Sequence, residues 1–356
     1  MKAMTYYGAG DIRFEERAKP QITSPTDAVV KILKTTICGT DLGIWKGKNP
    51  EIEAVAREKT GEWNGRILGH EGIGIVEAVG DAVKNIKVGD KVIISCVSKC
   101  CTCDNCKQQL YSHCRNGGWI LGYMIDGTQA EYVRTPYADN SLIPLPEGVN
   151  EEVALLLSDA LPTAHEIGVQ RGDVRPGDTV FIAGAGPVGM SALLTAQLYS
   201  PSVLIVCDMD ENRLKMAQEL GATHIINPAS GNVVEQVKSI VGEDGVDVAI
   251  EAVGIPATWD MCQEMVKPGG NVAVVGVHGV PVDFKLEKLW IKNLTITTGL
   301  VNTNTTEMLM KAISSSSVDY TKMLTHRFTF SELAKAYDVF KHAAENGAMK
   351  VVLTAE

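Results

Sequence analysis

The stretch Asp178-Thr-Val-Phe-Ile-Ala-Gly-Ala-Gly-Pro-Val-Gly-Met190 decides the fold of this chain. Its Val180–Ala183 run is short, apolar and β-rich, which is typical of a buried parallel strand. The run leads directly into Gly184, Gly186 and Gly189, which have the G-x-G-x-x-G spacing of a phosphate-binding turn. A helix-length apolar run follows. The stretch therefore predicts a strand, a tight turn and a helix in that order.

The three glycines suit a turn that receives a dinucleotide. Gly184 allows a tight turn, Gly186 lets the backbone approach a pyrophosphate, and Gly189 lets the helix pack near the strand. The next strand, Val203–Val206, ends at Asp208, where an acid can bind both hydroxyls of a ribose. A carboxylate there repels a 2′-phosphate, so we expect NAD rather than NADP. The spacing alone is often only a tight turn, but the two strands and the acid favour cofactor binding.

An alternation of strands and helices extends around this turn, from about residue 160 to residue 298. Six strands joined by helices predict a complete doubly wound parallel sheet and an α/β fold class. The clearest helix is Asn212–Leu220, which Gly221 ends. The expected strands are Thr179–Ala183, Val203–Val206, His224–Ile226, Val246–Glu251, Asn271–Val277 and Leu294–Thr298.

The two ends of the chain are richer in strand-like sequence than the segment at 160–298. Ala28–Lys34 alternates as a half-buried strand does, and Ile73–Val79 and Val88–Ile94 resemble a hairpin of a small β-barrel. Lys350–Leu353 predicts a last strand. The residues from about 300 onward are too few for a domain of their own, so we expect them to return to the first domain.

Composition limits the classes of protein to consider. The chain has 356 residues, 45% of them hydrophobic and 21% charged, which suits two globular domains with full cores. Its net charge of −10 disfavours a nucleic-acid partner. No segment approaches the roughly 18 unbroken apolar residues of a membrane helix. The first residues lack the pattern of a signal or transit peptide, so we expect a cytoplasmic protein with no membrane partner.

A cluster of cysteines predicts a structural metal site. The chain has nine cysteines, and four follow the pattern Cys100-x2-Cys103-x2-Cys106-x7-Cys114. Four thiolates at this spacing can close a tetrahedron around zinc and leave no position open for substrate. Disulfides are the alternative, which the absence of a signal peptide disfavours. Cys96 and Cys101 fall outside the pattern, and we expect Cys101 to be an exposed neighbour.

A second metal site is predicted from residues far apart in the sequence. A catalytic zinc has three protein ligands and one open position. Cys38 and His70 each lie in a glycine-containing turn, and Asp159 lies in an otherwise apolar segment, where a buried carboxylate requires a partner. Alone, such residues are usually a core cysteine, a hydrogen-bonded histidine and a helix cap. Their grouping ahead of a nucleotide domain favours a metal.

The combination of motifs resembles the zinc-dependent medium-chain alcohol dehydrogenases. It consists of Cys38-Gly-Thr-Asp41, Gly69-His70-Glu71, the four-cysteine lobe, the glycine-rich turn and Asp208, in the family's order along the whole chain. The resemblance implies a GroES-like β-barrel catalytic domain from residues 1–159 and 300–356, with a structural zinc lobe at 96–115. It also implies a Rossmann NAD-binding domain at 160–299 and a cleft that holds zinc and nicotinamide.

The resemblance implies roles for individual residues. Cys38, His70 and Asp159 match the catalytic zinc ligands, Glu71 matches an acid that can enter or support the zinc shell, and Thr40 matches the hydroxyl that takes the alcohol proton. Zinc is then expected twice per chain, once catalytic and once structural. The cofactor contacts implied are Thr163, Gly184, Gly186, Pro187, Val188, Gly189, Asp208 and Arg213. The substrate-pocket positions implied are Cys96, Tyr123 and Leu300.

Three features depart from the family's usual pattern. The third metal ligand is Asp159, as in many bacterial secondary-alcohol and polyol relatives, whereas the familiar set is Cys2His. Gly43 stands where many relatives have a histidine that passes the proton to solvent, so water or the ribose hydroxyl must complete the relay. The loop at 46–64, with an expected helical stretch at Glu51–Glu58, is about ten residues longer than usual and could reshape the cleft mouth or an interface.

The sequence therefore predicts an enzyme that interconverts short-chain primary or secondary alcohols and aldehydes or ketones, with hydride transfer to and from NAD. A small apolar lining near Cys96 and Leu300 favours a simple alcohol over a polyol, whose buried hydroxyls need partners. The alternatives are a polyol, butanediol or threonine dehydrogenase of the same family, or a non-catalytic NAD(P)-binding relative. The partner is a small molecule, and we expect a homo-oligomer, a tetramer rather than a dimer.

Overall fold

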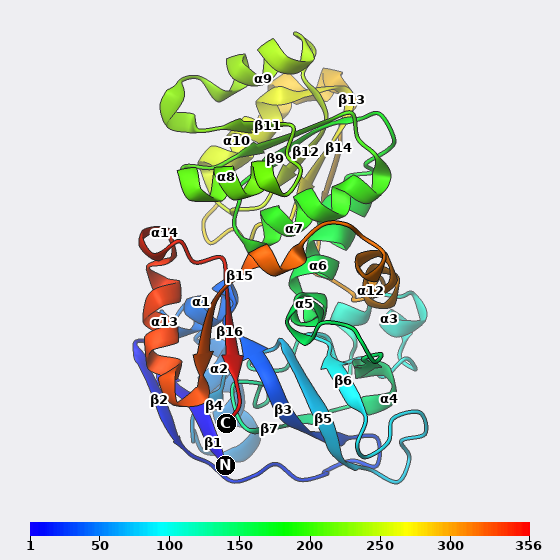
Figure 1. The fold of residues 1–356 in the computed structure, drawn as a ribbon, viewed down its shortest axis with the longest axis vertical. Coiled ribbons are helices and arrows are strands. Elements are labelled where there is room, and N and C mark those ends of the chain that lie inside the picture. The colour runs from blue at the N-terminus through cyan, green and yellow to red at the C-terminus, as the bar shows by residue number, and fades with distance from the viewer. The chain divides into compact units, whose positions relative to one another are not determined.

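The computed structural model describes residues 1–356, except for the side chains of residues 59 and 60. The chain forms two compact units (Figure 1). The first consists of Met1–Asp159, Asn302–Ser316 and Tyr320–Glu356, and the second of Ala160–Val301 and Ser317–Asp319. Among the described residues, no helix is both long and apolar enough to cross a membrane.

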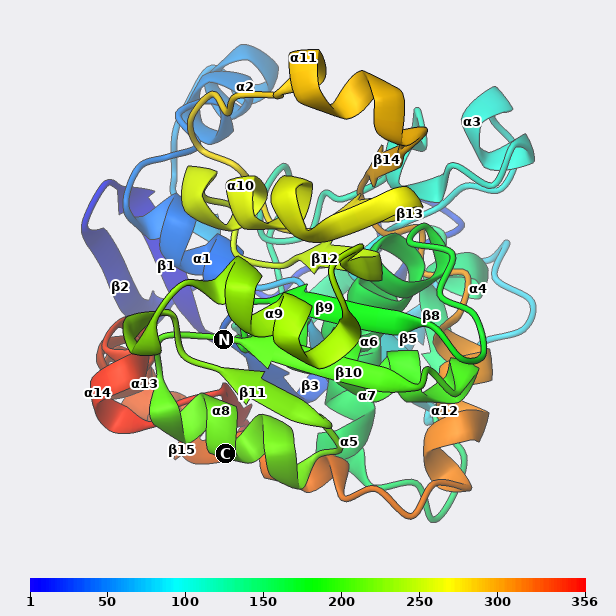
Figure 2. The ribbon, with the colours of Figure 1, turned by 90° about the horizontal axis from the view of Figure 1, so that it is seen from above.

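The second unit contains a six-stranded parallel sheet in the order β11-β10-β9-β12-β13-β14. This is the Rossmann strand order 3-2-1-4-5-6, in which the order reverses between β9 and β12. Helices α7 and α8 cover one face and α10 and α11 the other (Figure 2). The strands are β9 (Thr179–Ala183), β10 (Val203–Cys207), β11 (His224–Ile226), β12 (Val246–Glu251), β13 (Val266–Val274) and β14 (Thr295–Thr298).

The helices of the second unit follow the expected alternation. They are α6 (Ala160–Thr163), the π-helix η3 (Ala164–Gln170), α7 (Pro187–Ala196), η4 (Gln197–Tyr199), α8 (Glu211–Glu219), η5 (Pro228–Ser230), α9 (Val233–Val241), α10 (Pro256–Met265), α11 (Leu286–Leu289) and η6 (Trp290–Lys292). Asp210 caps α8 by accepting from the backbone N–H groups of Asn212 and Arg213.

One strand of this sheet differs from its expected range of 271–277. Strand β13 begins at Val266, which pairs with Val246, and a register shift then brings Asn271 opposite Val248. It ends at Val274, because the next two backbone N–H groups both donate to the carbonyl oxygen of Glu251, at 2.8 and 3.0 Å, and leave the ladder. Glu251 is therefore the last residue of β12, and its carbonyl oxygen also terminates β13 at the carboxyl end of the sheet.

The first unit is built from two sheets. One has seven strands, in the order β15-β16-β3-β5-β6-β8 with β7 also paired to β3, and the other has the order β2-β1-β4. The last strand of the chain lies beside β3, so the C-terminal residues complete this unit (Figure 1). The strands are β1 (Lys2–Gly8), β2 (Asp11–Glu16), β3 (Ala28–Thr36), β4 (Arg66–Ile67), β5 (Gly72–Val79), β6 (Lys91–Ile94), β7 (Tyr132–Thr135), β8 (Leu142–Pro144), β15 (Leu324–Thr329) and β16 (Lys350–Thr354).

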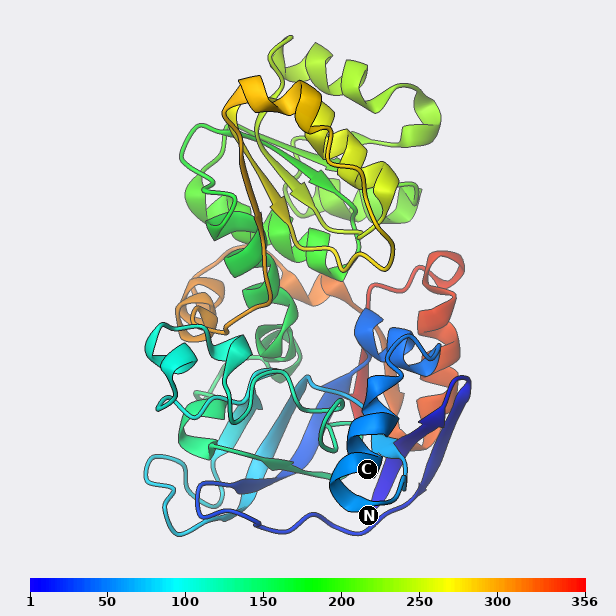
Figure 3. The same ribbon diagram turned by 180° about the vertical axis from the view of Figure 1, so that it is seen from behind.

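Short helices connect these strands, and the helix expected at 51–58 is present as α2. The lobe that contains α3 and η1 is seen from behind in Figure 3, in cyan. The helices are α1 (Gly39–Trp45), α2 (Glu51–Thr60), α3 (Asp104–Lys107), η1 (Tyr111–His113), α4 (Ala138–Ser141), α5 (Glu151–Leu155), η2 (Leu156–Ser158), α12 (Thr306–Ser314), η7 (Tyr320–Met323), η8 (Phe330–Glu332), α13 (Leu333–Lys341) and α14 (Ala343–Asn346).

Candidate metal and dinucleotide sites

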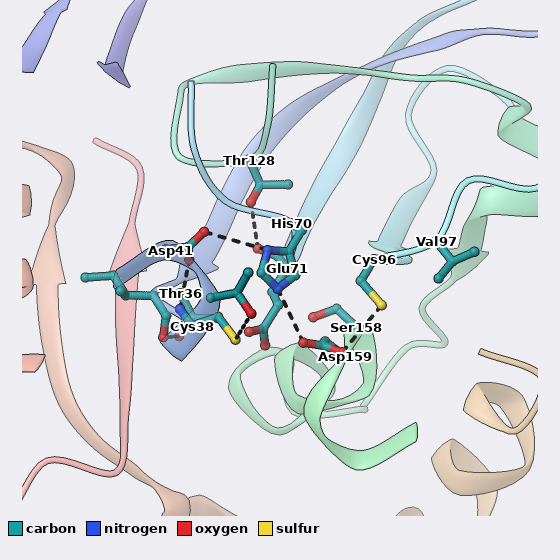
Figure 4. A network of polar contacts seen from close by, with 12 residues as sticks. Thr36, Cys38, Asp41, His70, Glu71, Cys96, Val97, Thr128, Ser158 and Asp159 are labelled. Atoms are coloured by element: carbon teal, nitrogen blue, oxygen red, sulfur yellow. Dashed lines mark hydrogen bonds and ion pairs between the residues drawn. The ribbon is translucent and has the colours of Figure 1, made fainter. Parts of the chain in front are cut away.

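Four potential metal ligands converge in the first unit. One donor atom from each of Cys38, His70, Glu71 and Asp159 lies within 4.8 Å of the others (Figure 4). His70 Nε2 lies 3.4 Å from Asp159 Oδ2. Cys38 precedes α1, His70 and Glu71 precede β5, and Asp159 lies between η2 and α6. The folded chain thus brings together side chains more than a hundred residues apart.

Local geometry directs the cysteine and the histidine into this cluster. The backbone N–H of Cys38 donates to Asp41 Oδ2 at 2.8 Å, which fixes the turn into α1. Gly69 has a φ of +91°, and a Cβ atom on it would lie 2.7 Å from the side chains of Thr128 and Gln129. Only glycine therefore suits the turn that aims His70.

Buried polar groups surround the histidine. Asp41 Oδ1 lies 3.7 Å from His70 Nδ1, and Asp41 Oδ2 accepts from Gln129 Nε2 at 3.2 Å. The Tyr337 hydroxyl in turn donates to Gln129 Oε1 at 2.6 Å. Burial opposes a charged imidazole, yet hydrogen bonds with Asp159 and Cys38 raise the pKa of His70 well above its ordinary value. The surroundings of His70 therefore favour positive charge, which is compatible with a bound divalent cation.

The four clustered cysteines form a second group of close donors. Their sulfur atoms lie within 4.8 Å of one another, with Cys100 and Cys106 at 3.9 Å and Cys103 and Cys114 at 4.0 Å. These distances exclude the disulfide alternative, and all four are free thiols. Burial opposes ionisation of Cys100, but hydrogen bonds from Thr102 and from the Cys103 backbone lower its pKa to about 5. Cys101 is exposed, as expected.

The glycine-rich turn lies in the second unit, between β9 and α7. Gly184 has a φ of +102°, and a Cβ atom on Gly189 would lie 1.8 Å from the Gly184 carbonyl oxygen. Both positions therefore require glycine. Gly186 caps α7, which begins at Pro187. The turn places the N-terminus of a helix at the point where the strand order reverses, which is where dinucleotides bind in this type of sheet.

The acid predicted to bind a ribose contacts the turn directly. Asp208 follows β10, and its Oδ2 accepts from the Ala185 backbone N–H at 2.7 Å. Arg213 lies nearby on α8, where its Nε is 3.8 Å from Asp210 Oδ2 and neither atom has a hydrogen-bond partner among the described residues. Buried polar atoms without partners beside an open Gly186 fit a site that a polar ligand completes.

Comparisons with known proteins place this chain in a family. The family model "Alcohol dehydrogenase GroES-like domain" matches residues 24–147, and "Zinc-binding dehydrogenase" matches residues 187–315. An alcohol dehydrogenase of Cupriavidus necator strain H16 is 32% identical over 99% of this chain and 98% of its own length. The chain belongs to the zinc-dependent medium-chain alcohol dehydrogenases. It is therefore an oxidoreductase with a GroES-like domain and a Rossmann sheet.

Solved structures of alcohol dehydrogenases have the same fold. The apo form of zinc-dependent alcohol dehydrogenase 2 from Streptococcus pneumonia is 51% identical, with a TM-score of 0.92 over 100% of this chain and 99% of that one. Alcohol dehydrogenase TADH from Thermus sp. ATN1 is 33% identical, with a TM-score of 0.90 over 100% of both chains. The fold class predicted from the sequence is confirmed.

A lysine that sequence analysis missed lies beside the candidate metal ligands of this dehydrogenase. Lys350, at the start of β16, is 2.5 and 2.6 Å from the two carboxylate oxygens of Glu71, and both residues are buried. Burial raises the pKa of Glu71, although Lys350 opposes the shift. A lysine at the start of a strand is usually predicted to be exposed, so the local sequence did not indicate that Lys350 is buried. Asp41 and Gln129 were likewise not among the predicted site residues.

Some of the remaining predicted residues belong to the first unit and others to the second. Thr40 Oγ1 is 3.9 Å from Cys38 Sγ. Cys96 Sγ is 3.5 Å from Asp159 Oδ1 (Figure 4). Tyr123 stacks on Trp119, another residue that the sequence did not single out. The cofactor residues Thr163 (α6) and Val188 (α7) lie in the second unit, where these two helices pack together, and Leu300 belongs to that unit and is 39% exposed.

Proposed function

We propose that this dehydrogenase interconverts short-chain primary or secondary alcohols and the corresponding aldehydes or ketones, with NAD as the hydride carrier. The observation that supports the proposal most is the convergence of Cys38, His70 and Asp159 donor atoms in one unit. The other unit supplies a glycine-rich turn with an acid bonded to it. The family uses such a pair of sites for oxidoreduction of small molecules.

The donors present fit a catalytic zinc. Sulfur, imidazole nitrogen and carboxylate oxygen are the ligand types that zinc takes, and the raised pKa of His70 indicates a cluster that favours positive charge. We assign Cys38, His70 and Asp159 as the ligands, with Glu71 held by Lys350 beside them. Zinc bound there supplies Lewis acidity toward an alcohol or carbonyl oxygen. We propose a second, structural zinc on the four clustered cysteines.

The chain's own side chains handle the proton and the orientation. The Thr40 hydroxyl, 3.9 Å from Cys38 Sγ, would accept the hydroxyl proton of an alcohol and return it in reduction. Gly43 offers no side chain for a further step, so the proton passes from Thr40 to water or to the cofactor ribose. The Asp41 carboxylate lies 3.7 Å from His70 Nδ1, beyond hydrogen-bond distance, so it acts on the ring through its charge.

We propose NAD rather than NADP as the cofactor. Asp208 is fixed by the Ala185 backbone N–H, so its carboxylate cannot readily move away from an incoming 2′-phosphate. Two solved structures at 26% identity hold different cofactors: one from Sinorhizobium meliloti is bound to NADP and one from E. coli CFT073 to NADH. Similarity to these structures therefore does not distinguish NAD from NADP, whereas the negative charge of Asp208 supports NAD.

A polyol is the second candidate substrate. Sorbitol dehydrogenase of Bacillus subtilis is 32% identical over 78% of this chain. A polyol, however, would need polar partners for each buried hydroxyl. The Cys96 thiol lies beside Asp159, and the Trp119 ring lies beside His70 with Tyr123 stacked on it. These groups favour a substrate with an apolar carbon chain.

A substrate panel tests the proposal. Primary alcohols, secondary alcohols, sorbitol, butanediol and threonine are each assayed with NAD and with NADP. We expect the highest kcat/KM with a simple alcohol and NAD. A higher kcat/KM with a polyol or threonine would show that this alternative is the substrate class. If none of the compounds is turned over, the result would favour a non-catalytic relative.

We also propose a homo-oligomer, a tetramer rather than a dimer. Strand β14 ends the sheet, with exposed Thr295 and Ile296, and the adjoining Trp290 and Ile291 are 69% and 67% exposed. A free strand edge beside large apolar side chains suits pairing with a second copy of the chain. Location in the cytoplasm stays a prediction.

A further inference from the structure

The long loop at 46–64 is anchored to the first unit at both ends of its helix. Ile52, in the first turn of α2, is 1% exposed and belongs to the same core cluster as Ile44. After the helix, the Trp63 indole N–H donates to the Tyr7 carbonyl oxygen at 2.9 Å, and the Trp63 ring meets Tyr6 edge-on with centroids 6.3 Å apart. The insertion is therefore a packed element with a defined position.

The first residue of α2 binds a tyrosine from a distant segment. The Tyr123 hydroxyl donates to Glu51 Oε1, and Asn49 Nδ2 donates to the same oxygen at 3.0 Å. These hydrogen bonds lower the pKa of Glu51, and burial together with Glu51 raises the pKa of Tyr123. A neutral phenol therefore donates to an ionised carboxylate, which is a stronger bond than one between neutral groups.

The tyrosine connects the insertion to the metal ligands through one further ring. Tyr123 stacks on Trp119, with ring centroids 4.4 Å apart and planes at 18°. Trp119 meets the ring of His70 edge-on, with centroids 6.2 Å apart and planes at 88°. His70 Nε2 is in turn 3.4 Å from Asp159. A continuous series of contacts thus runs from Glu51 to the cluster.

Both stacked rings keep part of their surface free. Trp119 and Tyr123 are only partly buried, whereas His70 beside them is 4% exposed. The Tyr123 ring also packs against the core cluster that includes Ile52. Core packing and the bond to Glu51 together fix one orientation of a flat, apolar surface next to the metal ligands.

We propose that Glu51 is a positioning residue that sets the size of alcohol the enzyme accepts. Glu51 fixes Tyr123, Tyr123 fixes Trp119 by stacking, and the two rings form a wall that limits the carbon chain of a substrate whose oxygen lies beside His70. The inference rests on the proposed function, because the wall matters only if an alcohol binds at this cluster. It assigns the insertion a role in substrate selection.

Four variants test the proposal. E51A removes the carboxylate, E51Q keeps an oxygen that accepts from the tyrosine, and Y123F keeps the ring but removes the donor. E53Q is the matched control, because Glu53 lies on the same helix but pairs with Arg57 at 2.8 Å. The measurement is kcat/KM for ethanol, 1-hexanol and benzyl alcohol, with zinc content, NADH affinity and the near-UV circular dichroism of the purified enzyme.

We expect the ratio of kcat/KM for benzyl alcohol to that for ethanol to rise about tenfold in E51A and in Y123F, because the wall loosens. An added double variant, E51A/Y123F, should show no more than either single change, since both changes break the same hydrogen bond. E51Q and E53Q should stay near the parent ratio. The near-UV spectrum should change in E51A and Y123F, while zinc content and NADH affinity stay constant.

Two results would overturn the inference in distinguishable ways. If all three alcohols slow by the same factor in Y123F and E51A, the wall does not select by size, and the proposed function stands without it. If the parent enzyme oxidises none of these alcohols, the proposed function and this inference fail together. Should E51A not fold, Y123F carries the same test with the ring in place.

Discussion

Lys350 Nζ lies 2.5 and 2.6 Å from the two carboxylate oxygens of Glu71, and the two side chains are 2% and 1% exposed. This ion pair joins the last strand of the chain to the turn that carries His70. Because both charges are buried away from water, each is stabilised by the opposite charge of its partner. We therefore expect K350M to lower the free energy of unfolding by about 3 to 5 kcal/mol, measured by urea denaturation.

A double variant separates loss of the pair from loss of packing. E71M/K350M removes both buried charges and should recover most of the stability that K350M loses. K350R keeps the charge and should cost less than K350M. If E71M/K350M were as unstable as K350M, the unpaired Glu71 carboxylate would not be the cause of the lost stability, and the prediction would be wrong.

A buried histidine in the second unit makes stability depend on pH. His165, in the π-helix η3, is fully buried, with Nε2 3.3 Å from the Tyr199 hydroxyl, and burial lowers its pKa to about 4. The unfolded chain, with an ordinary pKa near 6.5, binds more protons between these values, so the free energy of unfolding falls as the pH falls. Between pH 7 and 5 we expect the parent to lose about 2 kcal/mol more than H165N, by urea denaturation. Parallel pH profiles would refute this.

Cofactor choice should depend on one carboxylate. In D208G and D208N the negative charge next to the glycine-rich turn is gone, so the repulsion of a 2′-phosphate is relieved. The kcat/KM ratio of NADP to NAD should rise at least about tenfold, or about 1.4 kcal/mol. D208N keeps an oxygen that can accept from Ala185, so it controls for damage to the turn. An unchanged ratio in D208N would remove the charge from the explanation.

The free edge of β14 predicts an interface. I291E places a charge on a side chain that is 67% exposed next to that edge, and should shift the enzyme toward smaller species in size-exclusion chromatography with light scattering. V88E is the control, because Val88 is 62% exposed on a turn of the first unit. An I291E variant with the parent's mass would place the interface elsewhere.

Local patterns were sufficient to predict the nucleotide half of the fold. The apolar run at 179–183, the spaced glycines and Asp208 are close in sequence, and strand, turn and acid meet through neighbouring elements. Strand β13 begins five residues before the expected start at 271 and passes through Pro268 and Gly269, which are residue types that favour turns. The π form of η3 was not predicted either, since its residues also suit an ordinary helix.

Contacts between distant segments were harder to predict. Lys350 and Glu71 are 279 residues apart, and Gln129 and Tyr337 are 208 apart, so neither pair leaves a pattern in a short window. Cys38 and His70 were singled out by their glycine-containing turns and Asp159 by its apolar surroundings, and the fold brings their donor atoms together. The bond from Glu51 to Tyr123 depends on where an unusual insertion packs, which only the folded chain determines.

Zinc content tests the central claim, that Cys38, His70 and Asp159 hold a catalytic metal apart from the cysteine lobe. The purified enzyme, C38A, D159A and C103A are dialysed and analysed by plasma mass spectrometry, with alcohol turnover and NADH binding measured on the same samples. We predict about two zinc ions per parent chain and about one in C38A and D159A, with turnover lost and NADH binding retained. A folded D159A with two zinc ions and full activity would contradict the account.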